Sequence, residues 1–557
     1  MPTLQFKGKN IIWNHHLSIP YHSLQEVEDL SFQGDKGADN LIIEGDNLVA
    51  LKALLPQYSG KIDVVYIDPP YNTGDDNGIG KGWVYNDNVN SPLIREWLKK
   101  EVSKDDLTKH DKWLCMMTPR LKLLRELLTN SGVIFISIDD NEYHNLLSLC
   151  LEIFNEENFV PSFIWEKKKK PSFLHQNIGK VTEFIVCFTK DTNDSYPFSL
   201  ETTTKGKKYP FNNAGNSLET LTFKAQSVQF GIDDQIIEPQ DMSEGNIKTE
   251  LLDRIEIKDG RNHNNFRLKG EWRYSQNTLN EIIENNEAIY ISKIPFRPNH
   301  IKSGGEIKKM KNIFSPSHYN MQTNEDAKKQ LEELFGRSPF DYPKPVDLIK
   351  ALIKATTYHN ANAIILDSFA GSGTTMHAVN ELNKDGGNRK CILVQMTEAT
   401  DAEPDKNICR DITRERNKLA IEKYGYDSGF RYLKVGTAID PDTMLDGELP
   451  TYQQFAEYVF YLATGGHLAE KENINSENHF VGTEGSQAIY LIYEQDFDKL
   501  TRMALTLDIA EQIIAHSPGK RRTVFAPSCF LDEDYMTEKQ IEFVSVPYNL
   551  FERNTAD

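Results

Sequence analysis

Short apolar runs alternate with longer amphipathic stretches between residues 41 and 190. The runs fit buried strands, and the stretches between them carry apolar residues at the three- or four-residue spacing of a helix. This alternation predicts a doubly wound α/β fold with a mostly parallel sheet. Strands are expected at residues 41–44, 62–67 and 132–138, edge strands at 163–165 and 184–188, and helices at 47–55, 113–128 and 142–154.

The alternation stops between residues 191 and 338, where Asn, Gly, Ser and Lys become frequent, and it returns after residue 340. One sheet is therefore expected to be built from two separated stretches, with a different module inserted between them. The second stretch has a helix at 345–357, a strand at 363–366, a glycine-rich turn, a helix to 382 and a strand at 391–395. A last segment has a helix at 498–515 between strands at 488–493 and 523–526.

These patterns divide the chain into five parts. The sheet domain has two halves, residues 41–190 and 339–436, on either side of the insertion at 191–338. An N-terminal extension, residues 1–40, precedes it, and a small C-terminal α/β module, residues 437–557, follows. A length of 557 residues, of which 39% are hydrophobic and 26% charged, predicts three or four modules, each large enough to bury a core of its own.

Composition excludes several classes of protein. The first ten residues lack the layout of a signal peptide, and no apolar run reaches the roughly 20 residues of a membrane span, which favours a cytoplasmic protein. Six scattered cysteines without CxxC spacing argue against disulfides and structural zinc. No metal site is expected, and the adjacent His15 and His16 are interpreted as a surface feature.

The formal charge of -19 does not suit a protein that coats nucleic acid through bulk positive charge. Any contact with DNA must therefore be local. The best candidate is the stretch 291–320, where six basic side chains face one carboxylate, Glu306, although a solvated basic loop has the same composition. The basic side chains are Lys293, Arg297, Lys302, Lys308, Lys309 and Lys311.

The first motif with chemical meaning is Asp68-Pro69-Pro70-Tyr71, directly after a predicted strand. In an open parallel sheet, ligands bind outside the carboxyl ends of the strands. Two prolines fix the backbone, so the Asp68 carboxylate and the Pro69 carbonyl can accept the two hydrogens of an exocyclic amino group. Tyr71 offers a flat face on which a base can stack. A simple turn after a strand is the alternative interpretation, because Asp-Pro is common in turns.

The second motif is residues 364–375, Ile-Ile-Leu-Asp-Ser-Phe-Ala-Gly-Ser-Gly-Thr-Thr, in which a glycine-rich turn follows the strand expected at 363–366. Glycines let the backbone pass close to a ligand, and the next helix begins with free N–H groups. Neither the P-loop lysine nor the dinucleotide GxGxxG pattern is present. A ligand with an adenosine and a carboxylate fits better than a pyrophosphate, and a tight turn without a ligand remains the alternative.

Together the two motifs resemble those of the amino-methyltransferases in which the catalytic motif precedes the cofactor motif. Residues 68–74 resemble the catalytic loop of that family, and residues 367–375 resemble its cofactor loop. Shorter segments at 45–48, 340–345 and 395–398 are similar as well. The resemblance implies a methyltransferase sheet with a circularly permuted motif order and S-adenosyl-L-methionine as the cofactor.

The resemblance also implies roles for individual residues. Lys344 and Pro345 are expected to line the methionine part of the cofactor, and Glu398 is expected to bind the ribose hydroxyls. The implied catalytic residues are Asp68, Pro69, Pro70 and Tyr71. The implied cofactor-binding residues are Asp46, Phe340, Lys344, Pro345, Asp367, Phe369, Gly371, Gly373, Thr374 and Glu398.

A more specific resemblance, over roughly residues 41–436, is to the modification subunits of type III restriction-modification systems. Segments at 85–87, 113–121, 138–142 and 429–431 are similar to connecting elements of that family. There, Asp in the first catalytic position goes mainly with adenine and Ser with cytosine-N4, so cytosine stays possible. The insertion falls where the family carries its target-recognition domain, which favours the stretch 291–320 as a DNA-facing surface.

This resemblance implies direct methyl transfer to N6 of an adenine flipped out of duplex DNA, without a metal or a covalent enzyme intermediate. It also implies a homodimer and a restriction subunit as a partner, docked on the C-terminal module. Two other interpretations stay open. The chain could serve chiefly as the sequence-reading subunit that targets a helicase–nuclease, or it could methylate RNA or a small molecule, which explains the insertion less well.

Overall fold

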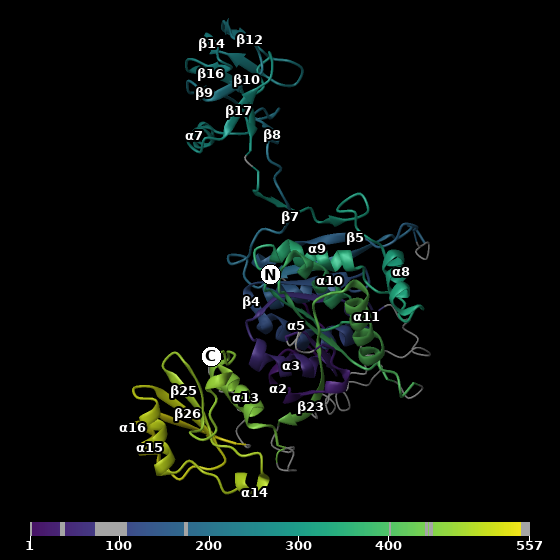
Figure 1. Cartoon of the computed structure of the whole chain (residues 1–557), viewed down its shortest axis with the longest axis vertical. Helices are drawn as coiled ribbons and strands as arrows, with labels where there is room; N and C mark the ends of the chain where they lie inside the picture. Colours follow the sequence, from purple (N-terminus) through teal and green to yellow (C-terminus); the bar gives the residue numbers. More distant parts are fainter. Residues whose placement is uncertain are drawn as a thin grey trace. The chain divides into compact units, whose positions relative to one another are not determined.

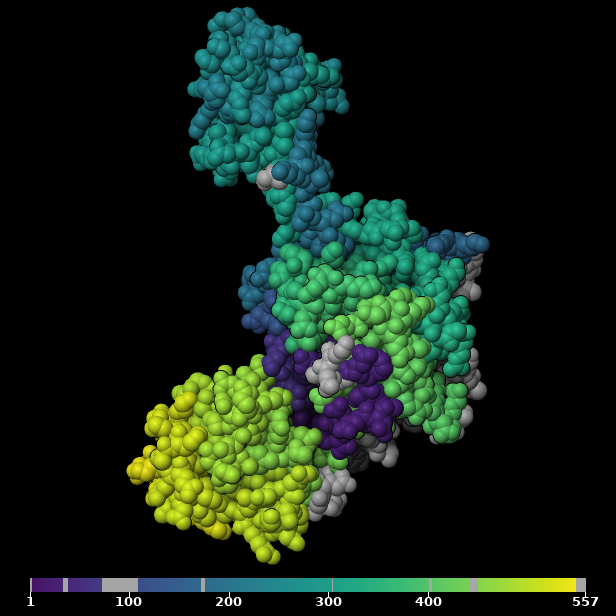
Figure 2. All heavy atoms as spheres, in the orientation of Figure 1, coloured from purple at the N-terminus to yellow at the C-terminus, as the bar shows by residue number. Residues whose placement is uncertain are grey.

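The computed structural model describes residues 3–33, 39–72, 109–171, 176–302, 304–399, 403–439, 444 and 449–546. It divides into two compact units, each with its own hydrophobic core. Unit 1 consists of Met1–Tyr196 and Lys311–Asp557, and unit 2 of Pro197–Met310. The colours of Figure 1 and Figure 2 show that early and late parts of the sequence build unit 1 together, as the patterns predicted.

The described part of unit 1 contains a ten-stranded sheet in the order β1–β23–β2–β22–β21–β3–β4–β6–β5–β20. The central strands from β23 to β4 run parallel, whereas β1 and β6 are antiparallel to their neighbours. Parallel neighbours require crossover connections, which the helices between the strands supply. The bounds are β1 (Tyr21–Glu26), β2 (Leu41–Glu44), β3 (Ile62–Ile67), β4 (Leu128–Ile138), β5 (Phe159–Glu166), β6 (Thr182–Thr189), β20 (Ile313–Phe314), β21 (Ile364–Asp367), β22 (Lys390–Gln395) and β23 (Arg431–Ile439).

Helices cover both faces of this sheet (Figure 1). Side chains of successive strand residues point to opposite faces of the sheet. Val65 belongs to the core on one face, and its neighbour Val64, equally buried, points to the other face. The doubly wound α/β prediction is therefore confirmed. No helix within the described ranges is both long and apolar enough to cross a bilayer. One face carries α3 (Asn47–Tyr58), α5 (Lys109–Leu127) and α6 (Tyr143–Phe154), and the other α9 (Val346–Thr357) and α10 (Thr374–Leu382).

Unit 2 is built mainly of short strands around an aromatic core. Phe223 stacks on Phe266 with 5.0 Å between the ring centroids, and Phe211 is fully buried beside them. Its described residues form sheets in the orders β11–β14–β15–β10–β17–β18–β8, β12–β13–β16–β9 and β19–β7. Its elements are β7 (Ser199–Thr202), β8 (Lys208–Pro210), β9 (Leu218–Phe223), β10 (Val228–Phe230), β11 (Gln235–Ile237), β12 (Gln240–Asp241), β13 (Thr249–Leu251), β14 (Ile255–Lys258), β15 (Arg261–Asn262), β16 (Phe266–Glu271), α7 (Gln276–Glu284), β17 (Ala288–Ile291), β18 (Asn299–Ile301) and β19 (Ile307–Lys309).

The separate unit is shorter than the insertion expected at 191–338. Residues 311–338 belong to unit 1, because β20 extends the main sheet beside β5 and α8 (Asn324–Phe335) packs on α11 (Glu415–Tyr424). The N-terminal extension expected at 1–40 also joins the sheet, since β1 pairs with β23. Both differences arise from pairings between segments far apart in the sequence, which a local pattern does not report.

The C-terminal module has a sheet of its own in the order β24–β25–β26–β27. The single helix expected at 498–515 is in fact two, α14 (Phe497–Leu500) and α15 (Leu507–His516), because the Thr506 side chain caps the start of α15. The Tyr461 hydroxyl donates to Glu126 at 3.1 Å and ties the module to α5. Its remaining elements are α13 (Tyr452–Thr464), β24 (Phe480–Glu484), β25 (Gln487–Leu491), β26 (Arg521–Ala526), α16 (Glu533–Glu538) and β27 (Ile541–Ser545).

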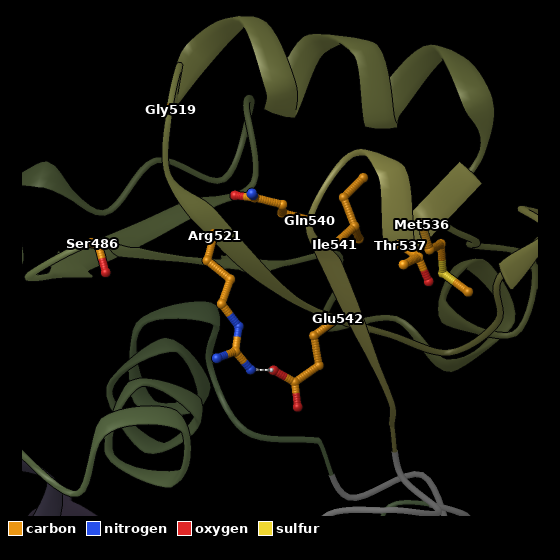
Figure 3. A pocket seen from close by; sticks show the side chains of 8 residues that line it. All are labelled: Ser486, Gly519, Arg521, Met536, Thr537, Gln540, Ile541 and Glu542. Atoms are coloured by element: carbon orange, nitrogen blue, oxygen red, sulfur yellow. Dashed lines mark hydrogen bonds and ion pairs between the residues drawn. The ribbon is translucent and has the colours of Figure 1, made fainter. Parts of the chain in front are cut away.

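A hollow of about 630 Å³ opens on this module (Figure 3). Arg521 and Glu542 face each other there at 3.1 Å, and both side chains are largely exposed, so they form an ordinary surface ion pair. The hollow contains neither of the two motifs. It is lined by Ser486, Gly519, Arg521, Met536, Thr537, Gln540, Ile541 and Glu542.

His15 and His16 are buried, which corrects the interpretation of this pair as a surface feature. They form the first half of α2 (His15–Ser18), a short helix that packs against α5. Burial, and then the nearby Arg120 guanidinium, lowers the pKa of His15 to about 4, so this ring is neutral at physiological pH.

Candidate active site

The two motifs lie side by side although some 300 residues separate them. Strands β3 and β21 are parallel neighbours, with Val64 opposite Ile365 and Val65 opposite Leu366. Asp68 follows the last residue of β3, and Asp367 is the last residue of β21. The catalytic loop and the glycine loop therefore leave the same edge of the sheet next to each other, where an α/β sheet binds its ligands.

Asp68, Tyr71 and Lys344 form a hydrogen-bonded cluster at this edge. The Tyr71 hydroxyl donates to Asp68 Oδ1 at 2.8 Å, and Lys344 Nζ donates to Asp68 Oδ2 at 2.5 Å and to the Tyr71 oxygen at 2.9 Å. Burial, and then the carboxylates of Asp68 and Glu183, raises the pKa of Tyr71 well above its ordinary value. The Tyr71 hydroxyl is thus a hydrogen-bond donor and no base.

Lys344 remains charged in this cluster. Burial alone would lower the pKa of Lys344, but the carboxylates of Asp68 and Glu183 outweigh it and raise that pKa. The resemblance implied a place along the methionine part of the cofactor. That role stays a prediction, and the structure brings the ammonium to the catalytic loop, with Asp68 as its partner.

Glu183 is a fourth member of the cluster, and the sequence interpretation missed it. It lies on β6 with only 6% of its side chain exposed. Its Oε2 lies 3.2 Å from the Tyr71 hydroxyl oxygen and 3.8 Å from Lys344 Nζ, while Oε1 accepts from Lys167 Nζ at 2.5 Å. The only signal in the sequence was that this acidic residue directly precedes the apolar run Phe-Ile-Val-Cys-Phe, which is typical of a buried strand.

The prolines of the catalytic loop have different surroundings. The Pro70 carbonyl accepts from Trp113 Nε1 at 2.7 Å, so the protein itself uses this acceptor and Pro69 stays the candidate for a substrate amino group. Asn72 then turns the chain with a φ of 55°, a conformation that Asn tolerates better than most residues. Thr73, Gly74 and the segment 85–87, which carried part of the resemblance, lie outside the described residues.

The glycine loop packs tightly against its neighbours. A Cβ at Gly371, whose φ is 51°, would lie 3.3 Å from the Phe340 ring, so these two predicted cofactor residues are in contact. At Gly373, with a φ of 78°, it would lie 2.5 Å from Asn417 Nδ2. Side chains at either position would strain the backbone and displace a neighbour. The loop therefore needs glycine at both positions.

Asp367 anchors the glycine loop through two hydrogen bonds. Its carboxylate accepts from the Phe369 backbone N–H at 3.0 Å and from the Thr375 hydroxyl at 2.5 Å. Burial raises the pKa of Asp367 to about 7, although these two hydrogen bonds oppose the shift. The buried Phe369 and this carboxylate thus fix the shape of the loop.

Arg416 lies behind the glycine loop and was also missed. It is fully buried, and one of its nitrogens donates to Ser372 Oγ at 2.7 Å and to Thr374 Oγ1 at 2.6 Å. Burial lowers the pKa of Arg416 to about 9. The Thr374 hydroxyl in turn donates to the backbone carbonyl of Lys344 at 3.2 Å, so the glycine loop and the catalytic cluster are connected.

Three other predicted cofactor residues lie at the starts of helices or the end of a strand. Asp46 caps α3 by accepting from two backbone N–H groups, which is a structural role in itself. Pro345 precedes α9 as its N-cap. Glu398 follows β22 with a φ of 56°, accepts from Gln395 at 3.0 Å, and has its pKa raised by burial. A partly buried acid at a strand end suits the predicted ribose contact.

The predicted basic DNA surface is dispersed. Arg297 points inward and donates to two backbone carbonyls of unit 2, while Lys302 pairs with Glu306 and Lys308 with Glu201. Lys311 belongs to unit 1. The side chains of Lys293 and Lys309 are exposed in unit 2 and that of Lys311 is exposed in unit 1, so the positive charge of this stretch is divided between the two units.

A second basic segment of unit 2, missed in the sequence, lies beside Lys302. Lys205 and Lys207 are exposed on the loop that leads into β8, and Lys208, also exposed, is the first residue of that strand, which pairs with β18. The ammonium groups of Lys207 and Lys302 lie 5.5 and 5.4 Å from the ring centroid of Tyr209. Basic side chains next to an aromatic ring are typical of protein surfaces that bind nucleic acid. The signal in the sequence was the run Lys-Gly-Lys-Lys.

Fold and site together define a class of protein. An α/β sheet with an Asp-Pro-Pro-Tyr loop at the end of one strand and a glycine loop at the end of the next is the arrangement of an amino-group methyltransferase. Residues 62–435 match the sequence family of DNA methylases, and the chain belongs to that family. It is a DNA methyltransferase whose methyl donor is S-adenosyl-L-methionine.

Curated relatives are similar over most of the chain. The Mod subunit of the type III restriction-modification enzyme StyLTI from Salmonella typhimurium is 30% identical over 84% of this chain and 67% of its own length. The EcoPI Mod subunit from Escherichia phage P1 is 33% identical over 65% of this chain and 58% of its own length. The type II methyltransferase M.KpnI from Klebsiella pneumoniae is 28% identical over 67% of this chain and 84% of its own length.

Proposed function

We propose that this DNA methyltransferase modifies N6 of an adenine flipped out of duplex DNA, in the cytoplasm, as the modification subunit of a type III restriction-modification system. The observation that carries the proposal is the Asp68 carboxylate at the end of β3, next to the glycine loop at the end of β21. The names of the StyLTI and EcoPI relatives support the type III assignment. A homodimer and a restriction subunit are the partners that this assignment implies.

The glycine loop fits the cofactor. Gly371 keeps a path open beside the Phe340 ring, and the first turn of α10 presents backbone N–H groups that suit a carboxylate. Glu398 stands at the end of the next strand, where an acid can accept from ribose hydroxyls. When bound, S-adenosyl-L-methionine supplies a methyl group on a positively charged sulfur.

The catalytic loop acts on the amino group. Asp68 and the Pro69 carbonyl accept its two hydrogens, which raises the electron density on the nitrogen and favours its tetrahedral form. The Tyr71 ring stacks on the flipped base and holds the nitrogen in line with the methyl group. Positive charge passes to the nitrogen during transfer, and the negative Asp68 carboxylate stabilises it there.

Unit 2 is the part of the chain best suited to meet the DNA. It contains sixteen Lys and Arg and sixteen Asp and Glu, so its net charge is zero, whereas the whole chain carries -19. The exposed lysines 205, 207 and 208, which we call the lysine loop, concentrate positive charge beside Tyr209. We expect this loop to contact phosphates, which position a protein on DNA without reading its sequence.

The test is long-read mapping of modified bases in DNA from cells that express this chain alone. The proposal expects N6-methyladenine at one short sequence. Methylation at cytosine N4 would overturn the adenine assignment, and unmodified DNA would overturn the proposed activity. Copurification from the native host then tests the type III assignment, because a stand-alone enzyme would bring down no helicase-sized chain.

A further inference from the structure

Glu183 is a buried carboxylate of the active site that has no role in the methyl transfer proposed for Asp68, Pro69 and Tyr71. Burying a carboxylate is costly unless it is paired and hydrogen-bonded. Its two oxygens are used differently: Oε1 accepts from Lys167, and Oε2 faces both the Tyr71 hydroxyl at 3.2 Å and Lys344 Nζ at 3.8 Å. Lys167 thus anchors the carboxylate, and its other oxygen is directed at the catalytic cluster.

The position of the Lys344 ammonium beside Asp68 is unfavourable for the proposed methyl transfer. The ammonium lies 2.5 Å from Asp68 Oδ2, and the Tyr71 hydroxyl donates to Oδ1, so both oxygens of the carboxylate are engaged before the target amino group enters. A positive charge at that distance withdraws electron density from Asp68, and it would oppose the positive charge that develops on the substrate nitrogen. Efficient transfer therefore requires Lys344 to leave Asp68 when the base enters.

Glu183 offers the place to which Lys344 can move. It is already 3.8 Å away, and the attraction between buried charges is only weakly screened by salt. We propose that Glu183 is a positioning residue, an inference that rests on the methyl transfer proposed for this site. Glu183 takes the ammonium of Lys344 from Asp68 as the base enters, and it accepts a hydrogen bond from the Tyr71 hydroxyl at the same time. Asp68 then regains its full negative charge for the amino group.

The first test replaces the carboxylate by its neutral isostere, Glu183→Gln. We expect kcat to fall by about 10- to 100-fold, the loss typical of misplaced catalytic groups, with the cofactor Kd and the KM for DNA within about threefold of the wild type. Glu152→Gln is the matched control, because Glu152 forms a comparably buried ion pair with Lys9 outside the site, at 2.6 Å. An unchanged kcat in Glu183→Gln would overturn the inference.

The second test separates positioning from mere structural support. In Glu183→Gln, Lys344 stays on Asp68, so removing it as well should help: we expect the double variant Glu183→Gln/Lys344→Met to transfer methyl faster than Glu183→Gln in single turnovers at saturating cofactor. A double variant that is no faster than Glu183→Gln would contradict the transfer of Lys344 from Asp68 to Glu183. The wild type and Glu152→Gln are assayed in parallel; if they too transfer no methyl to DNA, the proposed function itself fails.

Discussion

The ammonium of Lys344 donates a 2.5 Å hydrogen bond to the Asp68 carboxylate across 276 positions of the sequence. The backbone carbonyl of the same lysine accepts from Thr374 of the glycine loop at 3.2 Å. Lys344 thus touches the catalytic loop with its side chain and the cofactor loop with its backbone. Because of this link, a substitution in either loop needs separate measurements of methyl transfer and of cofactor binding.

Asp68→Ala is expected to lower methyl transfer by at least about 100-fold, because it removes the charged acceptor for the amino group. Cofactor binding should stay within a few-fold of the wild type, since the glycine loop keeps all its own hydrogen bonds. Methylation of duplex DNA and titration calorimetry with the cofactor measure the two effects. Full activity in Asp68→Ala would remove Asp68 from the mechanism.

Tyr71 contributes a ring and a hydroxyl, and two substitutions separate them. Tyr71→Phe keeps the stacking face but cannot hydrogen-bond to Asp68, Glu183 and Lys344, so we expect a moderate fall in kcat. Tyr71→Ala also removes the stacking, which is worth about 1–3 kcal/mol per base. Fluorescence of 2-aminopurine at the target position reports flipping. Equal flipping in the alanine and phenylalanine variants would contradict a stacking role.

The sheet and both motifs were predictable because they depend on local patterns. Apolar runs marked β3 and β21, and each motif follows its strand directly in the sequence. These features need no knowledge of which distant segments touch.

Glu183 and Arg416 were not predictable for the opposite reason. Their roles depend on contacts with Tyr71 and with Ser372, and neither residue lies in a motif or at a distinctive spacing. The boundary of the insertion was missed on the same grounds, since the two-residue strand β20 is recognisable only through its pairing with β5.

Gly373→Ala tests the fit of the cofactor loop. The new Cβ would meet Asn417 Nδ2 at 2.5 Å and the Thr413 carbonyl at 2.9 Å, and the backbone φ of 78° is itself unfavourable for alanine. Gly386→Ala is the matched control, because its φ is 88° and its surroundings are open. We expect about 1 kcal/mol of destabilisation in the control and more in Gly373→Ala, which alone should weaken cofactor binding. Denaturant unfolding and calorimetry measure both, and equal losses would contradict the predicted overlap.

Asp367 should make stability depend on pH. Burial raises its pKa to about 7 in the folded chain, whereas an unfolded aspartate titrates near 3.9. Between these values the unfolded chain has released the proton that the folded chain still holds, so the free energy of unfolding falls as the pH rises from about 4 to about 7.

Asp367→Asn removes this titration and keeps an oxygen for the Phe369 N–H. We expect the wild type to lose roughly 2–4 kcal/mol relative to the variant over that pH range. Denaturant unfolding at several pH values between 4.5 and about 8 measures the difference. Parallel pH profiles for the two proteins would contradict the raised pKa.

The lysine loop should determine how strongly DNA binding depends on salt. Removing one lysine–phosphate interaction lowers the slope of log K against log salt by about 0.9, so neutralising three lysines that each bind a phosphate lowers it by about 2.7. The weakening should be similar for specific and unrelated sequences, because phosphates carry no sequence information. A control triple variant elsewhere in unit 2 should keep the wild-type slope; an equal change in both would reduce the effect to net charge. The test variant carries Lys205→Gln, Lys207→Gln and Lys208→Gln, and the control carries Lys224→Gln, Lys248→Gln and Lys258→Gln, all at exposed positions.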